Sequence, residues 1–63
     1  MRRVVDLFKK SAKDQLLWTY IINLGQDGSH PSILDFKEEA LRLAILDNLG
    51  NEQTLIIKIR ESA

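Results

Sequence analysis

The chain has no cysteine and only one histidine in its 63 residues. Without thiols there is no disulfide and no thiolate ligand, and one histidine makes no zinc site unless ligands come from elsewhere. The hydrophobic core of so short a chain supplies no more than about 3–5 kcal/mol, so domains of this size usually gain stability from a disulfide, a metal or a partner chain. We therefore expect no metal and no cofactor, and we expect a homodimer or a dedicated protein partner.

Net charge and long apolar runs are also absent. Nine basic residues balance nine acidic ones, so no overall field favours nucleic acid or an anionic membrane. No apolar stretch approaches the roughly 20 residues that a membrane-spanning helix needs. Asp6, Lys9 and Lys10 interrupt any apolar segment that would form a secretory signal. These features, with the lack of cysteine, predict a cytoplasmic protein without a membrane span.

What is present is typical of one small globular domain. Hydrophobic residues make up 44% of the chain and charged residues 29%, which is too apolar for a disordered segment. We expect residues 1–63 to form a single domain.

The clearest element is a helix over residues 32–49. Ser32 is a good N-cap, and Asp35 three residues later completes a capping box. Glu38 and Arg42 have the spacing of an ion pair on one helix face. Gly50 follows where a left-handed residue is wanted to end the helix.

Residues 1–15 are expected to form a basic amphipathic helix. Apolar residues recur in this segment at spacings of three and four, and the lysines fall on the other side. The apolar positions are Val4, Val5, Phe8, Ala12 and Leu16.

Residues 16–24 fit two interpretations. As a strand, they place Trp18, Tyr20, Ile22 and Leu24 on one face, in a composition rich in β-branched and aromatic residues. As a helix, they would carry a polar stripe at four-residue spacing and stop at a glycine. We favour the strand, because Trp, Thr, Tyr and Ile are mediocre helix formers, and we expect Trp18 and Tyr20 to pack in the core.

A second strand is predicted over residues 53–60, after the loop at residues 25–31. Leu55, Ile57 and Ile59 alternate with Ile56 and Lys58. The expected fold is α+β in the order α-β-α-β, with a two-stranded sheet packed on the central helix. The alternative is a mostly α fold, a helical hairpin whose one C-terminal strand pairs across a dimer.

The helix over residues 32–49 is apolar around about twice the roughly 100° that one packing surface uses. A second surface must cover the excess, and the outer face of the sheet is also half apolar. We therefore expect a non-enzymatic interaction or regulatory protein that associates with itself. The candidate protein interface is Leu34, Leu41, Ile45, Leu46, Leu49, Ile21 and Ile56.

The alternative function is a nucleic-acid-binding module that uses the basic N-terminal segment. Catalysis is not expected, because His30 and its neighbouring serines lie on a loop that does not hold them in the geometry of a triad. The candidate nucleic-acid contacts are Arg2, Arg3, Lys9, Lys10, Lys13, Lys58 and Arg60.

Overall fold

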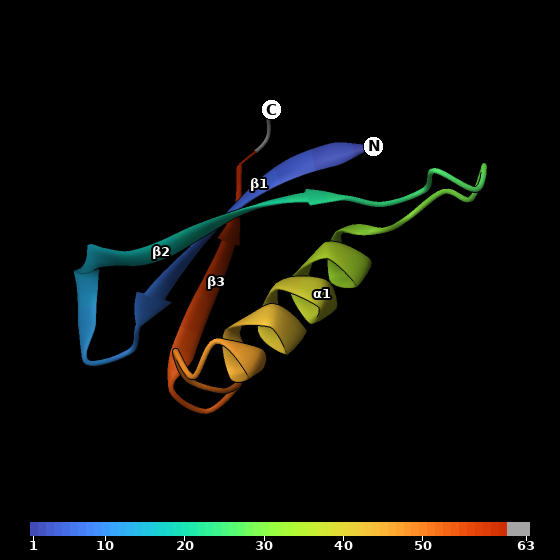
Figure 1. Ribbon diagram of the computed structural model, residues 1–63. Coiled ribbons are helices and arrows are strands. Elements are labelled where there is room, and N and C mark those ends of the chain that lie inside the picture. The colour runs from blue at the N-terminus through green and yellow to red at the C-terminus, as the bar shows by residue number, and fades with distance from the viewer. Residues whose placement is uncertain (61–63) are drawn as a thin grey trace.

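The computed structural model describes residues 1–60 and shows a small α+β fold, one sheet with one helix on it (Figure 1). The sheet is antiparallel, has three strands in the order β2-β1-β3, and has β1 at its centre. The elements in chain order are β1 (Arg2–Lys9), β2 (Ala12–Asn23), α1 (Ile33–Leu46) and β3 (Leu55–Ile59).

The predicted N-terminal helix is wrong, because residues 1–15 form β1, a tight turn and the start of β2. Val5 and Leu7 are fully buried and alternate with residues that point to the opposite face of the sheet. A central strand is stabilised by partners on both sides, and one partner of β1, the strand β3, lies 46 to 54 residues away in sequence, from the Lys9–Leu55 pair to the Val5–Ile59 pair. Lys10 and Ser11 make the turn without the glycine or asparagine that normally marks a hairpin.

The strand interpretation of residues 16–24 is correct, although β2 begins earlier, at Ala12. The predicted strand at residues 53–60 is present as β3. The expected pairing between these two strands is wrong, since β1 lies between them and hydrogen-bonds to both. The sheet therefore has three strands instead of two, and the element order is β-β-α-β.

The start of α1 follows the prediction. The amide of Asp35 donates to Ser32 Oγ at 3.3 Å, and the amide of Ser32 donates to Asp35 Oδ2 at 2.7 Å, so both halves of the capping box are present. The helix ends at Leu46, three residues before the predicted end. Asn48, with φ of 59°, takes the left-handed position expected for Gly50.

The predicted ion pair between Glu38 and Arg42 does not form. Arg42 bonds Glu39 instead, with Nε 2.5 Å from Oε1.

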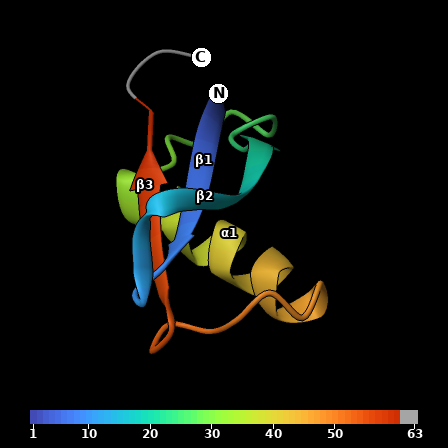
Figure 2. The same cartoon turned by 90° about the vertical axis from the view of Figure 1, so that its left-hand side faces the viewer.

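The core lies between α1 and one face of the sheet. Figure 2 looks onto the opposite face, with the strands in front of α1. We call this opposite side the open face, because α1 is the only helix in residues 1–60 and it covers the other side. The buried residues are Val5, Leu7, Ile22, Phe36, Ala40, Ala44 and Leu55.

Candidate interaction surface

The open face carries a polar network at its centre. Asp6 in β1 accepts a hydrogen bond from Thr19 Oγ1 at 2.7 Å and two from Arg60, at 2.8 Å from Nε and 3.1 Å from Nη2. The pKa of the Asp6 carboxyl is lowered, chiefly because Arg60 donates to the carboxylate, and the Thr19 bond adds to this effect while burial opposes it. The network therefore links β1 to β2 and to Arg60, the residue that follows β3, on the side away from α1.

Apolar residues surround this network. By strand alternation, Val4 and Phe8 lie on the same side of β1 as Asp6, and Ile56 lies opposite Phe8 on β3. These three are half-buried, whereas Ile21 on β2 is 64% exposed. The Lys58 ammonium sits 5.1 Å from the centre of the Phe8 ring, within the range of a cation–π contact. The open face is thus apolar at its margins and charged at its centre.

The outer edge of β2 is a second feature. Along residues 1–60, β2 pairs with β1 on one side and with no strand on the other. No Asp, Glu, Lys or Arg lies between Asp14 and Asp27. Leu16, Trp18 and Ile21 beside this edge are exposed. We call the unpaired side of β2 from Gln15 to Asn23, which contains no charged residue, the β2 edge.

The predicted protein interface is divided between separate surfaces. Ile21 and Ile56 lie on the open face, whereas Leu34, Ile45 and Leu46 are exposed on α1. The two remaining candidates, Leu41 and Leu49, are half-buried and pack against the core.

The predicted nucleic-acid contacts are also dispersed. Arg2 and Lys10 lie at opposite ends of β1, about 27 Å apart at 3.4 Å per residue. Lys10 Nζ is 3.4 Å from the carbonyl of Glu52. The others are placed as follows: Lys58 and Arg60 on the open face, Arg3 half-buried on the helix side, and Lys9 and Lys13 exposed near the β1–β2 turn.

Trp18 and Tyr20 do not both pack in the core as predicted. Trp18 is 52% exposed. Tyr20 is half-buried against the core, and its hydroxyl donates a hydrogen bond to Asp47, the residue that caps the end of α1. Trp18 lies two residues closer to the β1–β2 turn, so α1 ends too early to cover its indole.

Tyr20, the only tyrosine, gives a clear pH prediction. Burial, and then its bond to Asp47, raise the pKa of the phenol from 10.0 to about 12. Because the folded state favours the neutral phenol, this contribution to stability is complete below pH 10 and is lost as the pH rises toward about 12. Ultraviolet titration of phenolate should show the raised pKa in the folded protein and a lower one in urea. Asp47→Asn should lower it, and an unchanged pKa in that variant would contradict the assignment.

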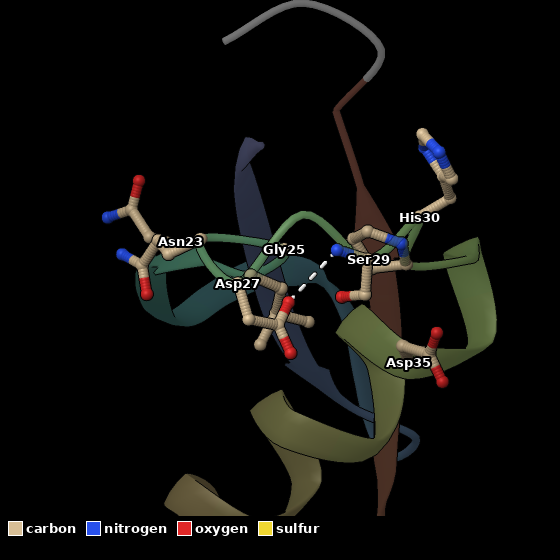
Figure 3. A pocket seen from close by; sticks show the side chains of 9 residues that line it. Asn23, Gly25, Asp27, Ser29, His30 and Asp35 are labelled. Atoms are coloured by element: carbon tan, nitrogen blue, oxygen red, sulfur yellow. Dashed lines mark hydrogen bonds between the residues drawn. The ribbon is translucent and has the colours of Figure 1, made fainter.

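A shallow hollow lies where the loop after β2 meets the start of α1 (Figure 3). Its volume is about 660 Å³, and both Asp27 and Asp35 line it. The amide of Ser29 donates to Asp27 Oδ1 at 3.0 Å, and His30 points away from both carboxylates. Residues 1–60 contain no cluster of three or more His, Cys, Asp or Glu residues suited to a metal. The hollow therefore offers neither an assembled triad nor a metal site.

Comparisons of the chain with protein-family models, with curated proteins and with solved structures give no match. Within residues 1–60, α1 is too short to cross a membrane.

Proposed function

We propose that this chain is a small non-enzymatic protein-interaction protein that associates with itself as a homodimer. The observation that carries the proposal is the β2 edge, which is unpaired, uncharged and flanked by exposed Leu16, Trp18 and Ile21. Natural edge strands are normally protected by charges, proline, bulges or short length. From Trp18 to Asn23, where β2 pairs with β1 in continuous register, the β2 edge has no charge, proline or bulge. Such an edge can pair with a further strand.

The size of the core supports the same conclusion. Among residues 1–60, only Phe36, Leu7 and Val5 are large side chains with essentially no exposed surface. Full burial of a tryptophan removes about 150–250 Å² from water, so covering the exposed half of Trp18 removes about 100 Å². At about 25 cal/mol per Å² this contributes about 2.5 kcal/mol per chain. That gain is comparable with the stability that so small a core provides alone.

Molar mass by light scattering after gel filtration, across a dilution series, tests the proposal. We expect a mass near twice that of the chain at high concentration, with Trp18 fluorescence shifting to shorter wavelength as the dimer forms. A mass equal to that of one chain at every concentration would contradict self-association.

Nucleic-acid binding is the second candidate, favoured by the presence of Arg2, Phe8 and Lys58 on one open sheet face. Phosphate contacts lose affinity steeply as salt rises, whereas apolar association barely weakens. Replacing Arg2 and Lys58 together by Gln removes the two cations that share this face with Phe8, so it should abolish such binding and leave the dimer intact. If the protein does not bind single-stranded oligonucleotides even at low salt, nucleic-acid binding is excluded.

A further inference from the structure

We propose that a second copy of this chain pairs antiparallel along the β2 edge, joining two three-stranded sheets into one. This inference rests on the proposed self-association and adds where the two chains meet.

The backbone groups at the edge follow from the pairing of β2 with β1. The amide of Leu24 donates to the carbonyl of Met1 at 2.9 Å, and the Met1 amino group donates back at 2.6 Å. Residues of antiparallel strands alternate between hydrogen-bonded and non-bonded pairs, so Ile22 and Tyr20 also direct their N–H and C=O groups toward β1. Thr19, Ile21 and Asn23 therefore direct theirs outward, to the β2 edge.

The regular part of this edge is short but well suited to pairing. From Trp18 to Asn23 the register with β1 is continuous, and the bulges lie beyond it, near Leu16. The other outer strand, β3, is shorter, contains Lys58 and is followed by Arg60. Charge and short length protect β3 in the way typical of natural edges, which leaves β2 as the receptive side.

The distribution of charge disfavours the open face as the dimer contact. The open face carries three basic residues and, in its central network, the acidic residue Asp6. The basic residues are Arg2, Lys58 and Arg60. Stacking two such faces would bring like charges together and remove the Asp6–Arg60 pair from water, which is costly. Two copies of the uncharged β2 edge meet without either cost.

Symmetry fixes the remaining geometry. A two-fold axis between antiparallel neighbours is perpendicular to the sheet, so both copies of α1 would lie on one side and the two open faces would join on the other. Residues that lie opposite each other in paired strands point to the same face of the sheet, so the two-fold axis must lie between one residue and the same residue of the partner chain. The middle of the regular segment Trp18–Asn23 falls between Tyr20 and Ile21, so one of these two residues lies at the axis. Either register places Ile21 in the new ladder, opposite Thr19 or opposite the partner's Ile21.

Amide hydrogen exchange tests the inference residue by residue. In concentrated protein, the amides of Thr19 and Ile21 should exchange about tenfold or more slowly than in dilute protein. The amides of Tyr20 and Ile22 should stay protected at both concentrations, because they bond to β1. This alternation distinguishes edge pairing from contact through either face.

A matched pair of variants completes the test. Ile21→Lys places a charge on the proposed ladder and should raise the dimer dissociation constant by at least about tenfold, while its circular dichroism stays native because Ile21 is 64% exposed. Leu34→Lys, at a site on α1 that is 61% exposed, should dimerise like the parent. A dimer whose Thr19 and Ile21 amides exchange rapidly would overturn edge pairing and leave self-association standing. A chain that is monomeric at every concentration would overturn both.

Discussion

Phe36→Ala is expected to give a chain that is largely unfolded at room temperature. Within the described part of the chain, residues 1–60, Phe36 is the largest side chain with no exposed surface, and it lies on the face of α1 that contacts the sheet. Truncating a buried phenylalanine to alanine costs about 3–5 kcal/mol, which equals the total that a core of this size supplies. Circular dichroism and urea titration would show the loss.

Leu34→Ala is the matched control for this prediction. It removes a large apolar side chain from the same helix, but at an exposed position, so stability should change by no more than about 0.5 kcal/mol. A Phe36→Ala variant that unfolds at the same urea concentration as the parent would contradict the packing of α1 described above.

Asp6→Ala should have the next largest effect, a loss of about 1.5 kcal/mol. Hydrogen bonds to charged groups contribute about 1.5–3 kcal/mol, and the lower value applies because the Arg60 side chain is half exposed. The variant leaves Thr19 and Arg60 without their shared acceptor. Urea unfolding at neutral pH measures the loss. Asp14→Ala, at an exposed position on the same sheet, should lose no more than about 0.5 kcal/mol.

The same network predicts how stability varies with acid. The pKa of Asp6 is lowered in the fold from 3.8, so its contribution is complete above the unfolded value and is lost as the pH falls through the lower, folded value. In the parent, the free energy of unfolding should therefore decrease with falling pH below about 4 more than it does in Asp6→Ala. Parallel pH profiles for the two proteins would exclude a contribution from Asp6.

The elements that could be predicted from the sequence are those with local signals. The capping box of Ser32 and Asp35 joins residues three apart, and the alternation along Leu55–Ile59 is visible within the strand itself. The end of α1 was misplaced because Asn48 and Gly50 both tolerate a left-handed conformation, and the nearer of them adopts it. Local chemistry therefore specified the α+β class and the start of the helix.

The N-terminal strand could not be predicted in the same way. The spacing of Val4, Val5 and Phe8 fits a helix as well as a strand, and the partners that decide between them lie in β2 and β3. Without β1 in the sheet, the two remaining strands have only each other as a predicted partner. Assigning this one segment to a helix therefore gives the wrong number of strands and the wrong element order in the predicted fold.

The polar network on the open face was missed for a related reason. Asp6, Thr19 and Arg60 are distant in sequence, and Asp6 and Arg60 meet only because β1 pairs with β3. Asp6 did carry one signal, as the only acid among the first thirteen residues. A lone carboxylate between apolar residues in a basic segment is a reason to look for hydrogen-bond donors or a basic partner elsewhere in the chain.

The proposed dimer would join the open faces of the two chains into one continuous surface. Each chain alone has an open face too narrow for a standard interface of about 800 Å² per partner, since three strands at about 4.8 Å span only about 14 Å. Joined along the β2 edge, the two faces would form a sheet surface about twice as wide. A further protein partner would meet a surface that one chain alone does not provide.

Pairing between two chains is tested by an isotope-edited NMR experiment on a mixture of labelled and unlabelled chains, which detects only contacts between chains. Pairing along the β2 edge predicts cross-peaks between the backbone protons of Trp18–Asn23 in one chain and the same segment in the other. Intermolecular contacts that come only from Leu34 and Ile45 on α1, or from Val4 and Ile56 on the open face, would contradict it.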